Sequence, residues 1–123
     1  ALVANVDGVG LRGQPVTVAF FNCPDEWAGA TRALMAARPG LEEAEPWPQG
    51  DHSLFAMQGV PCIALTSGGI LNIIESIIHT ANDTVAGVDV ERIAAAADFL
   101  GELLIQLGLP PPPPPAGSVA TIG

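Results

Sequence analysis

Two histidines with carboxylates beside them are the side chains in this sequence best suited to chemistry. His52 directly follows Asp51, His79 has Asp83 four residues further on, and Asp7 ends the first apolar run. Imidazole nitrogens and carboxylate oxygens bind hydrolytic metal ions such as zinc, and outer carboxylates orient the imidazole. Asp7, His79 and Asp51 are therefore candidates for a metal centre. The alternative is that such an Asp forms a turn and such a His is a solvated or helix-capping loop residue.

Other catalytic patterns fit this chain less well. Ser67, in Thr-Ser-Gly-Gly, lacks the Gly-x-Ser-x-Gly elbow of a nucleophilic serine. Residues 8–13 have Gly-x-Gly-x-x-Gly spacing, but a strand follows them rather than the helix that binds a dinucleotide phosphate. Cys62 lies in an apolar run, where a thiol is inert. We interpret Cys23 and Cys62 as two buried thiols or, alternatively, as one disulfide.

The composition excludes several classes of partner. The chain has 123 residues, a formal net charge of −9, four arginines that stand apart and no lysine. Because phosphate binding needs clustered cations, we expect no nucleic-acid contact and no binding to an anionic membrane surface. No apolar run reaches the ~18 residues of a membrane-spanning helix. The 49% of hydrophobic residues suffices for the core of one domain.

Three strands are predicted from apolar and β-branched runs. They are Leu2–Asp7, Pro15–Phe21 and Pro61–Thr66, and the last has the uninterrupted apolar character of a strand buried on both faces. Leu41–Gly50 is acidic and broken by proline, which allows at most a short edge strand. Ile70–Val88 is predicted to be a long loop, and such loops are commonly functional.

Three helices are predicted between and after these strands. The first is Asp25–Ala37, and a short second helix starts at Asp51, whose carboxylate is predicted to accept the amide hydrogens of Ser53 or Leu54. The third is capped by Asp89 and ends before Gly108. Its apolar positions fall on one predicted core-facing stripe: Val90, Ile93, Ala94, Ala97, Leu100, Gly101, Leu104 and Leu107.

These elements predict an α/β fold, a three-layer αβα sandwich with a mainly parallel or mixed sheet. We assign residues 1–109 to this domain and residues 110–123, which begin with six prolines, to a disordered tail. In such sheets the functional site lies at the carboxyl ends of the strands. Asp7 and the loop leading to His79 are both expected there.

Three stretches of this sequence occur in a recognisable order. They are Asn5-Val-Asp-Gly-Val-Gly10, Gly50-Asp-His-Ser-Leu-Phe-Ala-Met-Gln-Gly-Val-Pro61 and His79-Thr-Ala-Asn-Asp-Thr84. Together they resemble the C-terminal half of the co-catalytic zinc aminopeptidases, the superfamily of glutamate carboxypeptidase, the transferrin receptor ectodomain and glutaminyl cyclase. The resemblance, which spans Val3 to Leu107, implies that Asp7 ligates one zinc and His79 the second. It also implies that Asp51 is an outer carboxylate and that Asp83 holds the His79 loop.

The same resemblance identifies what is missing. Family members carry a His-x-Asp pair, a bridging Asp and adjacent glutamates, one of which is the general base, before the Asp7 motif. Here Glu42-Glu43 comes after that motif, so it does not match the family's pair. Ile78 stands where some members have an oxyanion-stabilising Tyr. We therefore expect this segment alone to contain no catalytic base, to bind zinc weakly and to hydrolyse nothing.

The resemblance implies the function of a zinc exopeptidase, of which this chain is one part. The complete enzyme is expected to be an aminopeptidase that hydrolyses N-terminal residues from peptides through water activated by two zinc ions. The alternatives are a metal-free interaction domain of the same fold and a glutaminyl cyclase. Since a half domain exposes a sheet edge and apolar helix faces, we also expect a homo-oligomer or association with the missing N-terminal half.

Overall fold

The computed structural model describes residues 1–109 and residue 116, and it contains one mixed sheet. Its strands are β1 (Val3–Val6), β2 (Val16–Phe21), β3 (Leu41–Glu43) and β4 (Cys62–Ser67), in the spatial order β1-β4-β2-β3. β1 is parallel to β4, β2 is antiparallel to β4, and β3 is parallel to β2. The α/β class and the mixed sheet are confirmed. The predicted tail, 110–123, lies outside the described residues apart from residue 116.

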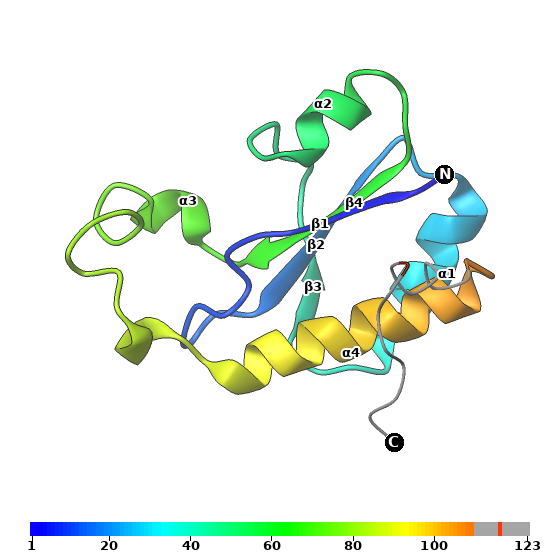
Figure 1. Cartoon of the computed structure of the whole chain (residues 1–123). Helices are drawn as coiled ribbons and strands as arrows, with labels where there is room; N and C mark the ends of the chain where they lie inside the picture. The colour runs from blue at the N-terminus through cyan, green and yellow to red at the C-terminus, as the bar shows by residue number, and fades with distance from the viewer. Residues whose placement is uncertain (110–115, 117–123) are drawn as a thin grey trace.

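Helices lie on both sides of this sheet (Figure 1). α1 (Asp25–Ala36) and α4 (Val90–Gln106) contact each other on one face, and α2 (His52–Ala56) contacts β1 and β4 from the other. The connection after β4 contains the helical turn α3 (Ile70–Ile73) and the 3-10 helix η1 (Val85–Gly87). The prediction that this connection is entirely loop is therefore wrong in part, because short apolar runs form single helical turns within it.

The core is built around β4, whose six residues are all buried. This confirms the prediction of a strand covered on both faces. On the α4 side, its alternate residues join β2 and both long helices in one hydrophobic cluster, which comprises Val9, Val16, Val18, Met35, Ile63, Leu65, Ala96, Phe99 and Leu103. Each fully buried large side chain contributes about 1.5–3 kcal/mol relative to its exposed state.

α4 begins as predicted but packs through a different stripe. The Asp89 carboxylate accepts hydrogen bonds from the backbone N–H groups of Glu91 and Arg92, which confirms the N-cap. Every residue of the predicted stripe is exposed or half-buried, so the prediction that this stripe faces the core is wrong. Because apolar side chains cover more than half of this helix's circumference, periodicity alone does not determine which part meets the sheet. The residues that are buried are Ala96, Phe99 and Leu103.

α2 begins without the predicted cap. Asp51 has helical backbone angles, and its side chain accepts no hydrogen bond from the first turn. Instead, the Gly50 carbonyl accepts from the backbone N–H of Ser53 at 3.1 Å and from its hydroxyl at 2.6 Å. The prediction of Asp51 as the N-cap is therefore wrong, because a backbone oxygen one residue earlier closes this turn.

Candidate functional site

A cavity of about 650 Å³ opens at the edge of the sheet where β1 and β4 end. It is lined by the loop after β1, the last residues of β4, the segment from α3 to η1, and the first turn of α4. Figure 1 shows α3 and the loop that follows it on this side of the molecule. Because β1 and β4 are parallel, their carboxyl ends and the loops that follow them meet at one edge.

Asp7, His79 and Asp83 all line this cavity. Asp7 directly follows β1, and its backbone N–H donates to the Leu65 carbonyl of β4 at 3.1 Å. All three side chains are on exposed residues. The structure thus brings the two predicted metal ligands, which are far apart in sequence, to the rim of one cavity.

His79 lies in a turn with an unusual backbone conformation. Its φ is +59°, a left-handed value that is uncommon outside glycine. The Asp83 carboxylate accepts a hydrogen bond from the His79 backbone N–H at 3.3 Å. Within the same turn, the Thr80 hydroxyl donates to the Ile77 carbonyl at 2.6 Å. These local bonds hold the backbone that carries the imidazole.

The other histidine is placed quite differently. His52 is only 1% exposed. Its Nδ1 lies 3.2 Å from the Asn5 amide nitrogen, and its Nε2 lies 3.1 Å from the Trp47 carbonyl oxygen. The tautomer with a proton on Nε2 satisfies both contacts, because it donates to Trp47 and accepts from Asn5. Both ring nitrogens are then occupied, and neither is available to a metal ion.

His52 instead supports one wall of the cavity. Its ring centroid lies 4.7 Å from that of Phe21 and 4.5 Å from that of Trp47, which meets it edge-on. Trp47 and Gly50 themselves line the cavity. Asp51 is exposed and does not line the cavity. Its role as an outer carboxylate stays a prediction.

Ser67, the last residue of β4, positions the loop after Asp7, a role that the sequence did not predict. Its hydroxyl donates to the Gly8 carbonyl, and its oxygen accepts from the Leu11 backbone N–H at 3.0 Å. Ser67 is 2% exposed. It therefore fixes the loop that follows Asp7. The available signal was that the apolar strand ends in two polar residues, Thr66 and Ser67.

Arg12 is a second residue that holds the loops of the cavity in place and that the sequence did not predict for this role. Its guanidinium donates to the carbonyls of Ala86 at 3.0 Å and Val88 at 2.8 Å. Leu11 and Val88 also form an isolated antiparallel bridge. These contacts connect the loop after Asp7 to the segment after His79. Spacing along the chain offered no signal for this contact, because the two segments are more than 70 residues apart.

The rest of the cavity lining is mostly apolar. Trp47, Val9, Val88 and Ile93 contribute to it, and the α3 segment adds a run of aliphatic side chains. This run consists of Ile70, Leu71, Ile73, Ile74, Ile77 and Ile78. A cavity with this lining and a few polar groups at its rim is typical of a site for a small molecule or a side chain.

The two cysteines are free thiols. Cys23 packs against the hydrophobic cluster on the α4 side of the sheet, and its thiol donates to the Cys62 carbonyl at 3.2 Å. The Cys62 thiol lies on the opposite face, 3.8 Å from the His52 carbonyl. Burial raises the pKa of both thiols, which lowers their reactivity. The structure supports two free thiols rather than a disulfide, and the prediction that both are buried holds for Cys62 only, because Cys23 is half-buried.

Asp7 and His79 have side chains of a type that binds zinc, but two ligands are too few to form a zinc site. A carboxylate oxygen and an imidazole nitrogen are both zinc ligands, whereas a zinc site needs about four donors. Among residues 1–109 and 116, no group of three or more His, Cys, Asp or Glu side chains is arranged to hold a metal ion. These residues can contribute to a metal site, but they do not complete one.

Comparison with protein-family models, curated proteins and solved structures gives no match to this chain. In the part of the chain that the structure describes, no helix combines the length and the apolar character needed to cross a membrane.

Proposed function

We propose that this chain is part of the catalytic domain of a zinc-dependent exopeptidase, an aminopeptidase that hydrolyses N-terminal residues from peptides. The observation that carries the proposal is the position of Asp7 and His79 on the rim of one cavity at the carboxyl edge of the sheet. Their order and sequence context resemble those of the zinc aminopeptidases. The finer fold that we propose is a three-layer αβα sandwich, with α1 and α4 in one layer and α2 in the other.

In this proposal each residue has a separate role. Asp7 holds one zinc ion and His79 holds a second, while Asp83 fixes the turn that carries His79 through its backbone N–H. Bound zinc supplies a Lewis acid and lowers the pKa of its water. No glutamate lines the cavity among the described residues. A general base and the remaining ligands must therefore come from another polypeptide segment.

The cavity supports a peptide substrate with an apolar first residue. Its aliphatic lining matches an uncharged side chain, and the Asp83 carboxylate at its rim, which is not a proposed zinc ligand, attracts a free terminal amine. The net charge of −9 favours the same cationic end group. We expect the complete enzyme to prefer leucine-like residues over acidic ones.

A metal-free interaction domain of the same fold is the second candidate. It is favoured by one observation, that the described residues contain no cluster of three metal-binding side chains. The two candidates differ in whether Asp7 and His79 bind zinc at all.

Calorimetric titration of the chain with zinc distinguishes the two candidates. Weak binding is expected for the native sequence, with loss of binding in Asp7→Asn and in His79→Gln. Asp98→Asn is a matched control, because Asp98 is an exposed carboxylate on α4 outside the cavity. Equal zinc binding by all four proteins would overturn the metal assignment, and no binding by any of them would favour the metal-free domain. With leucine p-nitroanilide we expect no turnover by this chain alone.

A further inference from the structure

One residue of the loop after β1 binds three consecutive carbonyl groups at the end of η1. The Arg12 side chain donates from Nε to the Ala86 carbonyl at 3.0 Å and from Nη2 to the Val88 carbonyl at 2.8 Å. The carbonyl between them, that of Gly87, accepts from the Arg12 backbone N–H at 2.9 Å. Because a guanidinium carries its donors in a planar fork, one side chain can hold both outer carbonyls. We name these three hydrogen bonds the Arg12 clamp.

The loop on one side of the Arg12 clamp is bonded to β4. The Ser67 hydroxyl, at the end of β4, donates to the Gly8 carbonyl, and its oxygen accepts from the Leu11 backbone N–H at 3.0 Å. The Asp7 backbone N–H also donates to a β4 carbonyl, at 3.1 Å. Ser67 is buried, so its hydrogen bonds are shielded from competing water. Asp7 and the clamp are therefore held in place relative to the sheet.

The segment on the other side of the clamp, which carries His79, is bonded mainly to itself. In the part of the chain that the structure describes, residues 70–84 form hydrogen bonds only with residues 69–87. None of residues 69–87 is buried. Segments with few buried contacts are the first to open locally. On the C-terminal side of His79, the Arg12 clamp is therefore where this segment is attached to the loop after Asp7.

We propose that Arg12 is a positioning residue, whose guanidinium holds the segment that carries His79 in a fixed position relative to Asp7. Arg12 does not line the cavity, so it acts through the backbone of the two loops rather than by touching a ligand. Two zinc ions that act together lie about 3.5–4 Å apart, which leaves little freedom in the separation of their ligands. This inference rests on the proposed function, which makes Asp7 and His79 those ligands.

The charge of Arg12 distinguishes positioning from a simple electrostatic effect. Arg12 and a zinc ion are both cations, so removal of the guanidinium charge lowers the repulsion and strengthens zinc binding. Removal of a positioning residue weakens zinc binding, because the two ligands no longer keep their separation. The two explanations therefore predict changes of opposite sign in Arg12→Gln.

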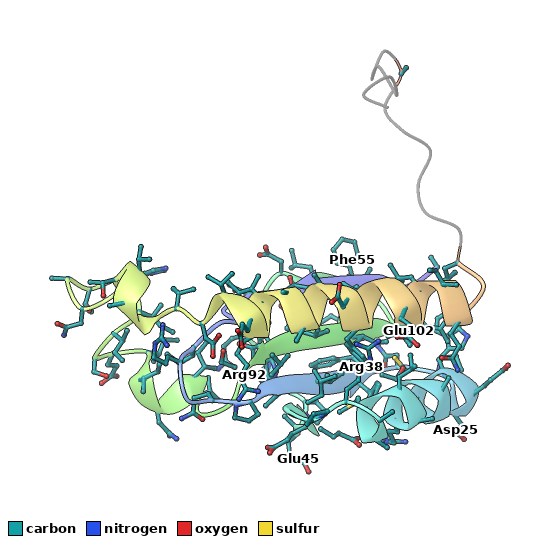
Figure 2. The ribbon with its side chains drawn as sticks, turned by 90° about the horizontal axis from the view of Figure 1, so that it is seen from below. Asp25, Arg38, Glu45, Phe55, Arg92 and Glu102 are labelled. Carbon is teal, nitrogen blue, oxygen red and sulfur yellow. The ribbon has the colours of Figure 1, made fainter. Side chains whose placement is uncertain are left out.

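Calorimetric titration with zinc compares Arg12→Gln with Arg32→Gln. Arg32 is a matched control, because it is exposed, donates two hydrogen bonds to Glu43 and does not line the cavity. It lies on α1, which Figure 2 shows near one end of α4, with η1 beyond the other end. Both substitutions remove one positive charge. We expect zinc to bind about tenfold more weakly to Arg12→Gln and with native affinity to Arg32→Gln.

Arg12→Lys tests the shape of the guanidinium at constant charge. Lysine carries all its donors on one nitrogen and lacks the fork that reaches two carbonyls, so we expect an intermediate loss of zinc affinity, about threefold. Urea denaturation separates positioning from folding. Because Arg12 and Arg32 are both exposed, the midpoints of the two glutamine variants should agree. A loss of stability in Arg12→Gln that parallels its loss of zinc binding would show a merely structural role and contradict the inference.

Hydrogen exchange tests the Arg12 clamp without zinc. The Asp89 backbone N–H donates to the Gly10 carbonyl at 2.7 Å, in the same contact between the two loops. Its exchange should accelerate about fivefold in Arg12→Gln and stay at the native rate in Arg32→Gln. Native exchange rates in both variants would overturn the inference, whether or not zinc binds.

The zinc titration separates a failure of this inference from a failure of the proposed function. Zinc affinity in Arg12→Gln that equals or exceeds the native value, with binding still lost in Asp7→Asn and His79→Gln, would overturn the inference alone. A native chain that binds no zinc would contradict the proposed zinc site. The exchange rate of the Asp89 amide would then decide whether Arg12 holds the two loops together.

Discussion

The surroundings of His52 and His79 differ in almost every respect, although each histidine has an aspartate close by in the sequence. His52 is buried between Phe21 and Trp47, and both of its nitrogens are hydrogen-bonded. His79 is exposed at a cavity rim, in a turn with a positive φ. The first environment fixes the imidazole as part of the fold, whereas the second leaves its nitrogens available to a ligand. The same residue type therefore has a structural role in one region and a candidate binding role in the other.

The largest expected effect on stability is at His52. His52→Ala removes two hydrogen bonds and the packing between two aromatic rings, so the free energy of unfolding should fall by about 3 kcal/mol. Urea denaturation monitored by circular dichroism measures this change. His79→Asn is the matched control, since asparagine tolerates a positive φ, and it should change stability by no more than about 0.5 kcal/mol. Equal losses of stability in the two variants would contradict the conclusion that His52 is structural and His79 is not.

Asn5 is expected to have the next largest effect. Asn5→Ala leaves the buried Nδ1 of His52 without its donor, which should cost about 1.5 kcal/mol. Asn72 is an exposed residue on α3 and provides the control substitution to alanine. A double-mutant cycle with His52→Ala measures the coupling between the two side chains. A coupling energy of zero would show that this hydrogen bond does not contribute.

Asp89 connects the His79 segment to the rigid part of the fold. Asp89→Ala removes the cap from α4, and we expect a loss of about 1 kcal/mol in the free energy of unfolding. Asp98→Ala, in the exposed middle of the same helix, should have little effect. Chemical denaturation of both variants checks this difference. If Asp89→Ala lowers the free energy of unfolding no more than Asp98→Ala does, α4 is stabilised by packing alone.

A smaller, local effect is expected at Asp83. Asp83→Ala removes the acceptor of the His79 backbone N–H, so the exchange of that amide hydrogen should accelerate about fivefold, while global stability stays nearly constant. Hydrogen exchange followed by NMR provides the measurement. Asp51→Ala is the control, because its side chain holds no part of this turn. Unchanged exchange at His79 in Asp83→Ala would contradict the role of Asp83.

The smallest effect is expected at the Arg32–Glu43 ion pair, which is solvent-exposed. The two hydrogen bonds from Arg32 lower the pKa of Glu43. A lowered pKa in the folded state contributes stability above the unfolded pKa, and this contribution is lost as the pH falls through the folded value. The stability difference between the native chain and Glu43→Gln should therefore be largest at neutral pH and vanish in acid. Glu42→Gln is the control, and a pH-independent difference would contradict the assignment.

The sheet was largely predictable because its strands are formed by apolar and β-branched runs. The first four residues of β4, Cys62 to Leu65, are apolar, and its preceding proline and following glycines define its ends. The capped start of α4 was equally clear, since Asp89 immediately precedes a long helical pattern. The face of α4 that meets the sheet was not predictable. A helix that is apolar around most of its circumference has several possible contact stripes, and tertiary packing selects among them.

The candidate site was predictable only in part. Asp7 and His79 were identified through sequence context, and strand topology accounts for their approach. The contacts of Ser67 and Arg12 depend on loop-to-loop geometry, which spacing along the chain does not encode. The role of His52 was also missed, because burial and the Asn5 hydrogen bond come from tertiary structure. Asp51 showed that an aspartate before a helix does not always cap it, since Gly50 supplies the acceptor instead.

The position of Trp47 has a practical consequence. Its indole touches the buried imidazole of His52 and forms part of the cavity wall. The only other tryptophan, Trp27, lies on α1, outside the cavity. Replacing Trp27 with phenylalanine would leave a single intrinsic fluorophore beside the site. Its emission would then report the entry of unlabelled molecules, so that a library of compounds could be screened before any substrate is known.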